Sequence, residues 1–131
     1  MDLVARLRAA GCVFAEEEAE LLADADEGAI ARRVAGEPLE HVLGWAAFRG
    51  LRVAVAPGVF VPRHRSELLV DLAVARTAPG AVVVDLCCGT GALGAAVAAE
   101  VGGVELHAAD LDPVALACAR RTVPGLSLIH I

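Results

Sequence analysis

A glycine turn between two acidic residues is the part of this sequence whose residue types and spacing can do chemistry. One apolar run ends in Asp85 and leads into Cys87-Cys88-Gly89-Thr90-Gly91, and a second apolar run ends in Asp110. Glycines let a backbone approach a ligand closely, and a helix start offers free N–H groups. A carboxylate after the next strand accepts hydrogen bonds from ribose hydroxyls. The spacing therefore indicates a site for a cofactor that contains adenosine.

The turn itself is compatible with more than one cofactor. Gly89 to Gly94 spells G-x-G-x-x-G, which is typical of NAD-dependent oxidoreductases. Two features argue against that class: Asp85 precedes the turn, and about eighty residues come before it, whereas a nicotinamide domain usually opens with this unit. Asp85 and Asp110 could also be ordinary loop acids, although turn, acid and spacing coincide here.

Hydrophobic periodicity predicts the elements of the first half of the chain. We expect helices over 3–10 and 15–33, separated by Gly11 and ended by Gly36-Glu37-Pro38. Their apolar positions are Leu3, Leu7, Ala10, Ala19, Leu21, Leu22 and Ile30. Strands over 51–55 and 59–61, around a turn at 56–58, predict a β-hairpin.

The second half predicts alternating helices and strands. Ser66 is expected to cap a helix over 67–76. The inward-facing residues of this helix are expected to be Leu68, Leu69, Leu72 and Ala73. Four elements follow: strand 81–86, helix 91–101, strand 104–109 and helix 113–121. This order is typical of βαβ units in a parallel sheet, so we predict an α/β fold.

Composition limits the possible partners and location. The 131 residues are 57% hydrophobic and carry a net charge of −6, all of which comes from residues 1–40. Because no segment concentrates basic residues, we expect no direct nucleic-acid binding. We find neither a cleavable leader nor an apolar run of membrane-spanning length, so we expect no membrane association and a cytoplasmic location.

The four cysteines match no zinc-ligand spacing, and we predict no metal site. Cys87 and Cys88 are expected to be small apolar fillers, with a redox or metal role as the alternative. Free thiols are the default in the reducing cytoplasm.

The segment from Asp85 to Gly91 resembles motif I of class I S-adenosylmethionine-dependent methyltransferases. The resemblance implies S-adenosylmethionine as the cofactor, bound by Asp85, Cys87, Cys88, Gly89, Thr90 and Gly91. It makes Asp110 the ligand of the ribose hydroxyls, and Asp112 an acid at a helix N-terminus. Cys87 departs from the pattern, because it stands where the family has its first glycine and its Cβ makes a positive φ costly.

An upstream block over residues 36–67 contains Gly36-Glu37-Pro38, Leu43-Gly44, Phe48, Gly50-Leu51, Pro57-Gly58, Val61-Pro62-Arg63 and Ser66-Glu67. This block resembles the HemK/PrmC family, the protein-(glutamine-N5) methyltransferases that modify peptide chain release factors. The resemblance covers residues 36–123 and implies methyl transfer to a glutamine amide nitrogen, with a release factor as partner. Phe60 is expected at the cofactor pocket, or alternatively in the hairpin core. Arg63 and Arg65 are candidates for a carboxylate of the substrate or cofactor, or are solvated.

The resemblance implies an incomplete Rossmann-like class I methyltransferase domain, preceded by a short helical domain and a β-hairpin linker. We expect a helical domain over 1–35, the linker over 36–65 and the first half of the cofactor domain over 66–125. Residues 126–131 are interpreted as a foreign tail, or alternatively as a true third strand. The family's Asn-Pro-Pro-Tyr motif, which holds the glutamine amide, is absent from the chain. We therefore assign no catalytic residue and expect a fragment without turnover.

Two other functions stay open. A methyltransferase of nucleic acid or of a small molecule would share related motifs. A non-catalytic nucleotide-binding or interaction module would need only the cofactor turn.

Overall fold

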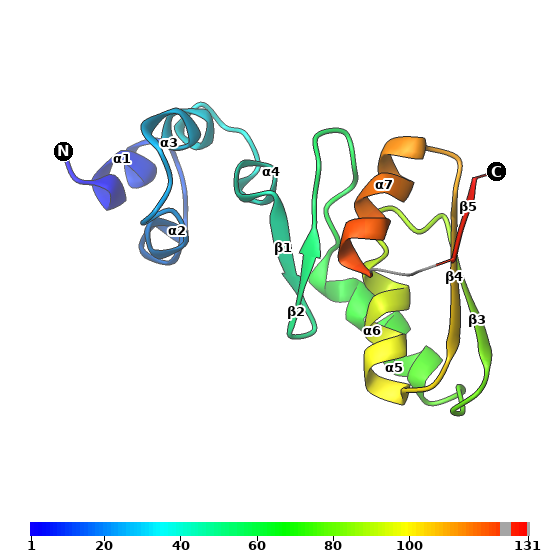
Figure 1. The fold of residues 1–131 in the computed structure, drawn as a ribbon. Helices are drawn as coiled ribbons and strands as arrows, with labels where there is room; N and C mark the ends of the chain where they lie inside the picture. The colour runs from blue at the N-terminus through cyan, green and yellow to red at the C-terminus, as the bar shows by residue number, and fades with distance from the viewer. Residues whose placement is uncertain (124–126, 131) are drawn as a thin grey trace. The chain divides into compact units, whose positions relative to one another are not determined.

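The structure is a computed structural model that describes residues 1–123 and 127–130. It divides into two compact units, Met1–Gly44 and Trp45–Ile131. Figure 1 shows the elements of both along the chain.

The first unit is a group of short helices. These are α1 (Leu3–Ala9), α2 (Ala15–Leu21), α3 (Glu27–Val34) and α4 (Leu39–Leu43). Leu7, Cys12, Ala15 and Leu22 form its buried core. Arg33 of α3 holds Glu18 of α2 through two hydrogen bonds of 2.6 and 2.9 Å, so an enclosed ion pair joins these helices.

The single helix predicted over 15–33 is wrong, because the structure has two helices there. The carboxylate of Asp26 accepts a hydrogen bond of 2.7 Å from the N–H of Ala29 and thereby starts α3 anew. Leu21, expected among the apolar positions, is exposed, while its neighbour Leu22 is fully buried.

The second unit begins with an antiparallel hairpin, β1 (Trp45–Phe48) and β2 (Leu51–Ala54). Its two-residue turn consists of Arg49 and Gly50, both at positive φ, as tight hairpin turns require. The predicted hairpin was wrong in its pairing: β2 pairs with 45–48, not with 59–61. Residues 59–61 form no strand and follow a turn in which the N–H of Val59 bonds to Ala56 O.

A short 3₁₀ turn (His64–Ser66) leads into α5 (Glu67–Val74). The helix starts where it was predicted, but the Ser66 side chain makes no capping hydrogen bond. Of the predicted inward face, Ala73 does pack against the core, but the other three positions were wrong. Val70 is buried against the hairpin and α6, whereas three of the expected residues are exposed: Leu68, Leu69 and Leu72.

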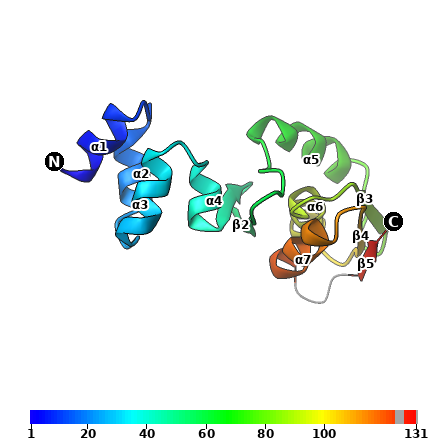
Figure 2. The ribbon, with the colours of Figure 1, turned by 90° about the horizontal axis from the view of Figure 1, so that it is seen from above.

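The remaining elements alternate as predicted. They are β3 (Val82–Leu86), α6 (Ala92–Val101), β4 (Glu105–Asp110), α7 (Pro113–Thr122) and β5 (Ser127–His130). The three strands form a parallel sheet in the order β3-β4-β5. In both views α5, α6 and α7 lie on one side of this sheet (Figures 1 and 2). The predicted α/β fold with βαβ units is therefore confirmed.

The opposite face of the sheet is apolar where β3 meets solvent. Val82, Val84 and Leu86 are each more than half exposed, and among the described residues no helix covers them. The predicted tail lies partly outside the described residues. Within them, the backbone of 127–130 pairs with β4 as a third parallel strand, and whether this segment is native or foreign stays open.

No helix in the described part of the chain is both long and apolar enough to cross a bilayer.

Candidate functional site

The turn between β3 and α6 is built on residues with positive φ. Cys87 has φ 58°, Gly89 54° and Gly91 79°. The departure noted in the sequence is therefore real: Cys87 adopts a conformation that costs a residue with a Cβ roughly 1–2 kcal/mol. Gly91 is required for a second reason, because a Cβ there would lie 3.1 Å from the Cβ of Ala119 in α7. The absence of a side chain lets the two helices approach at the turn.

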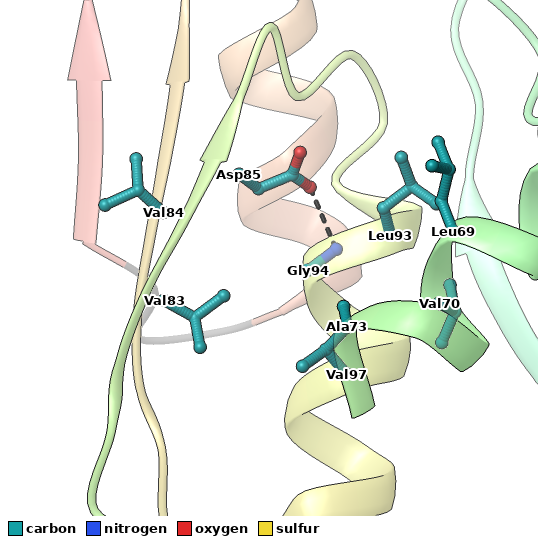
Figure 3. Close-up of a pocket in the computed structure, with 9 residues that line it drawn as sticks. All are labelled: Leu69, Val70, Ala73, Val83, Val84, Asp85, Leu93, Gly94 and Val97. Atoms are coloured by element: carbon teal, nitrogen blue, oxygen red, sulfur yellow. Dashed lines mark hydrogen bonds between the residues drawn. The ribbon is translucent and has the colours of Figure 1, made fainter. Parts of the chain in front are cut away.

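Asp85 anchors the helix that follows the turn. Its Oδ2 accepts a hydrogen bond of 2.9 Å from the N–H of Gly94, in the first turn of α6 (Figure 3). Partial burial raises the pKa of Asp85, the Gly94 hydrogen bond opposes this rise, and the charge of Asp110 adds to it. This carboxylate lines an apolar cavity of about 160 Å³ between β3, α5 and α6, bordered by side chains such as Val83, Leu69 and Val97.

Asp110, at the end of β4, holds the other side of the turn. Its Oδ2 accepts from the N–H of Gly89, and its Oδ1 accepts from the N–H of Asp112, both at 2.9 Å. These backbone hydrogen bonds, first that of Asp112 and then that of Gly89, lower the pKa of Asp110. Each carboxylate oxygen has further acceptor capacity, so Asp110 can hold the turn and still accept ligand hydroxyls.

Asp112 has the role that was expected of it. Its carboxylate accepts from the N–H of Val114 at 2.9 Å and caps α7, with Pro113 at the first helical position. It therefore belongs to the helix start rather than to the ligand site.

A second cavity, of about 140 Å³, lies beside the turn. Four segments contribute to its lining: Phe48 of β1, the loop before α5, turn residues 87–90, and the first residues of α6. The guanidinium of Arg63 lies over the ring of Phe60, 5.1 Å from its centroid. The cavity thus combines an exposed aromatic ring, a cation and a turn backbone, a set that suits a nucleoside with a charged tail.

The structure brings most of the predicted site residues to this second cavity. Five of them line it: Phe60, Cys87, Cys88, Gly89 and Thr90. The other three do not appear in its lining, since Asp85 lines the neighbouring cavity, Gly91 faces α7, and Asp110 reaches the site through Gly89.

The alternatives left open by the sequence are partly decided. Phe60 is 66% exposed, so the hairpin-core alternative is wrong. Cys88 is buried with Ala108, Leu116 and Ala119, as expected of a filler, and its pKa is raised to about 11 by burial and then by Asp85 and Asp110. Cys87 is exposed, so the filler interpretation fails for it. Among the described residues no three His, Cys, Asp or Glu side chains are grouped for a metal.

Sequence reasoning missed two contributors. The last glycine of G-x-G-x-x-G, Gly94, served only as an argument for NAD, yet it is the partner of Asp85. A Cβ at Gly94 would lie 3.0 Å from both Cβ and Oδ2 of Asp85, so the strand acid and this glycine form one motif. Phe48, which the sequence marked only by its place in the upstream block, is buried in the cluster between the hairpin and α6 and also lines the second cavity.

Comparisons with known proteins place the chain among methyltransferases. Residues 50–128 match the methyltransferase small domain family. A release factor glutamine methyltransferase of Streptomyces coelicolor is 44% identical over 100 residues, which cover 73% of this chain and 36% of the relative. A 4-amino-L-phenylalanine/4-methylamino-L-phenylalanine methyltransferase of Streptomyces pristinaespiralis is 37% identical over 105 residues, covering 73% of this chain and 35% of that protein.

Among solved structures, the Pyrococcus abyssi tRNA (uracil-54, C5)-methyltransferase in complex with S-adenosyl-L-homocysteine is similar. It has a TM-score of 0.52 at 18% identity over 66% of this chain and 22% of that one. This likeness supports the Rossmann-like fold class predicted from the sequence. The chain spans only about a third of the length of these curated relatives.

Proposed function

The chain belongs to the methyltransferase small domain family, as a HemK/PrmC relative, and we propose that its turn binds S-adenosylmethionine. The observation that carries this proposal is the position of Asp110. One carboxylate fixes the Gly89 N–H and lies at the end of the strand next to the turn, where it can accept two ribose hydroxyls.

Each part of the site has a task in this proposal. Asp110 orients the ribose, Phe60 covers an apolar face of the ligand, and Arg63 meets a carboxylate. The N–H groups of Ala92 and Leu93 at the start of α6 have no partner within the helix and can donate to polar ligand atoms. When bound, S-adenosylmethionine supplies an electrophilic methyl group. The residues described here hold and orient that group and shield it from water.

We further propose that the protein acts on the side-chain amide nitrogen of a glutamine in a peptide chain release factor, in the cytoplasm and without direct nucleic-acid binding. The identity to release factor glutamine methyltransferases supports this substrate. The four free cysteines are compatible with a reducing compartment. Because the sequence contains no Asn-Pro-Pro-Tyr motif to hold the amide, we propose that the 131-residue chain binds the cofactor without turnover.

Methylation of a small aromatic amine is the second candidate. The 37% identity to the amino-phenylalanine methyltransferase favours it, since that name describes transfer to a nitrogen of a free amino acid. The two candidates share the cofactor site and differ in the acceptor.

Calorimetry on the chain with S-adenosylmethionine, S-adenosylhomocysteine and NAD tests the cofactor. We expect binding of the first two and none of NAD. Preference for NAD would restore the oxidoreductase interpretation, and no binding at all would favour a non-catalytic interaction module.

Transfer of a radiolabelled methyl group tests the proposed lack of turnover and would reveal the acceptor if turnover occurred. The chain is incubated with a release factor, with DNA, with RNA and with 4-amino-L-phenylalanine, and a release factor glutamine methyltransferase serves as the positive control. We expect label only in the control. Label in the release factor with this chain alone would contradict the proposed lack of turnover, and label in the amino acid would favour the second candidate.

A further inference from the structure

Arg49 lies in the turn of the hairpin, outside the lining of both cavities, and yet it contacts two helices. Its Nη2 lies 2.7 Å from Oε1 of Glu100 in α6, and its Nη1 lies 2.7 Å from Oδ1 of Asp71 in α5. The same Nη1 donates to the backbone carbonyl of Glu67, and the Arg49 N–H donates to the Glu67 carboxylate. One residue therefore joins three elements.

The backbone at Arg49 indicates that these contacts hold it in place. Its φ of 46° is in the left-handed region, which the first residue of such a turn must occupy and which Asn, Asp or Gly occupies with less strain. Its side chain is only 19% exposed despite its place at a hairpin tip. An arginine in an unfavourable conformation, enclosed by three acidic residues, is typical of a junction and not of a solvated turn.

The joined elements are those that form one side of the cofactor cavity. Phe48, next to Arg49, lines that cavity, and so does Ser66, next to Glu67. Ala92 and Leu93 line it from the start of α6, the helix that carries Glu100. Asp85 and Asp110 fix the turn side of the cavity through Gly94 and Gly89, whereas the opposite side depends on how the hairpin and α5 sit against α6.

Apolar packing makes the rest of this junction. Phe48 and Val53 of the hairpin, Val70 of α5 and Ala96 of α6 form one buried cluster. Such packing holds the hairpin, α5 and α6 together, but it leaves their exact relative position less well defined, because apolar contacts are non-directional. The directional hydrogen bonds of the planar Arg49 guanidinium fix that relative position.

We propose that Arg49 is a positioning residue for the cofactor cavity: it sets the distance between the Phe48–Ser66 side and the turn, and so controls cofactor affinity without touching the ligand. This rests on the proposed function. The ligand it serves is the adenosine cofactor of that site.

The test uses three variants of the whole chain. Arg49→Met keeps the length of the side chain and loses the charge, and Arg49→Lys keeps the charge and loses the planar fork. Val101→Ala is the control for lost packing alone, because Val101 packs against the same cluster at the far end of α6. The stability of both variants is measured, so that their hydrogen exchange can be compared under conditions of equal stability. The probe is S-adenosylhomocysteine, measured by calorimetry at low and high NaCl.

We expect Arg49→Met to bind the probe roughly tenfold more weakly, because it uncouples three elements that share one site. Arg49→Lys should be intermediate, and Val101→Ala should stay within about twofold of the parent chain. Because added salt screens ion pairs, the parent and Arg49→Met should differ less in their affinity for the probe at high NaCl than at low NaCl. Equal affinity of parent and Arg49→Met, or an equal loss in Val101→Ala, would overturn the inference.

Hydrogen exchange without ligand separates this inference from the proposed function. In Arg49→Met, amides of residues 62–66 and 92–93 should exchange faster than in Val101→Ala under conditions of equal stability. If the parent binds no probe, the proposed function fails, and the exchange rates still decide the role of Arg49. Unchanged exchange in these segments would refute it.

Discussion

Asp85 and Gly94 are joined by a hydrogen bond of 2.9 Å that leaves no space for a side chain on Gly94. The acid at the end of β3 thereby fixes the first turn of α6, while Asp110 fixes Gly89 in the turn itself. Two carboxylates thus hold the two ends of the turn between β3 and α6. Their environments move their pKa values in opposite directions, which makes their roles separable by experiment.

For Asp85→Asn we expect a chain at least as stable as the parent at pH 7. The pKa of Asp85 is raised in the folded state, mainly by burial. The folded chain therefore binds this proton more tightly than the unfolded chain does. The Asp85 contribution is fully present below the unfolded pKa and is lost as pH rises through the folded pKa. The amide oxygen of Asn can still accept from Gly94 without a buried charge.

Urea denaturation between about pH 4 and pH 8 measures this effect. The parent should lose stability over part of that range relative to Asp85→Asn. A variant that is less stable than the parent by more than about 1 kcal/mol at pH 7 would show that the charged carboxylate, not just its acceptor oxygen, holds Gly94.

For Asp110→Asn we expect the opposite. The pKa of Asp110 is lowered by hydrogen bonds from Asp112 and Gly89, so its contribution is present above the unfolded pKa and is lost as pH falls through the folded pKa. At pH 7 the variant should lose about 1 kcal/mol, a modest value because solvent screens this carboxylate. It should also bind S-adenosylhomocysteine more weakly than Asp85→Asn does. Affinity of Asp110→Asn equal to that of the parent chain would exclude Asp110 as the ribose ligand.

For Cys87→Gly we expect a gain in thermal stability. Glycine relieves the positive φ of 58°, worth roughly 1–2 kcal/mol, and loses roughly 0.5–1 kcal/mol through its greater freedom in the unfolded chain. The matched control is Cys87→Ala, which removes the thiol but keeps the Cβ, and it should leave stability nearly unchanged. Differential scanning fluorimetry measures both, and a gain in the alanine variant equal to that in glycine would trace the effect to the thiol instead of the backbone.

Gly91→Ala and Gly89→Ala separate backbone strain from crowding. Both glycines have positive φ, but a Cβ at Gly89 meets nothing within 4 Å, whereas at Gly91 it meets Ala119 at 3.1 Å. We expect a loss of roughly 1–2 kcal/mol for Gly89→Ala from strain alone. Gly91→Ala should lose about 1–3 kcal/mol more, because α6 and α7 must separate. Equal losses of stability in denaturant titrations would mean that α7 can move away from Gly91 at little cost.

Helices and strands that are marked by local sequence signals, such as a helix-start residue or an apolar run, were predicted correctly. Pro113 after Asp112 marked the start of α7, and the apolar runs before Asp85 and Asp110 marked the two strands. Where local signals competed, the prediction was wrong. The break before Asp26 interrupts a run that reads as continuous helix, and the hairpin pairs through Arg49-Gly50, a turn without the Asn or Asp that usually announces it.

In the candidate site, too, the residues marked by local sequence signals were predicted and most of the others were not. The turn residues 87–91 and Asp110 came from a motif, which is local in sequence. On the opposite side of the cavity only Phe60 was predicted, because Phe48 and Ser66 meet the turn only through tertiary packing. Hydrophobic periodicity also could not predict that Leu68 and Leu69 are exposed, because the face that a helix buries depends on which neighbouring elements cover it.

The exposed thiol of Cys87 offers a site for chemical labelling. The other three cysteines are buried, and the pKa of Cys88, its immediate neighbour, is about 11. A mild alkylating dye should therefore label Cys87 selectively, with no cysteine removed by mutagenesis. Since Cys87 lines the cavity, a dye on its thiol would report on whatever binds there.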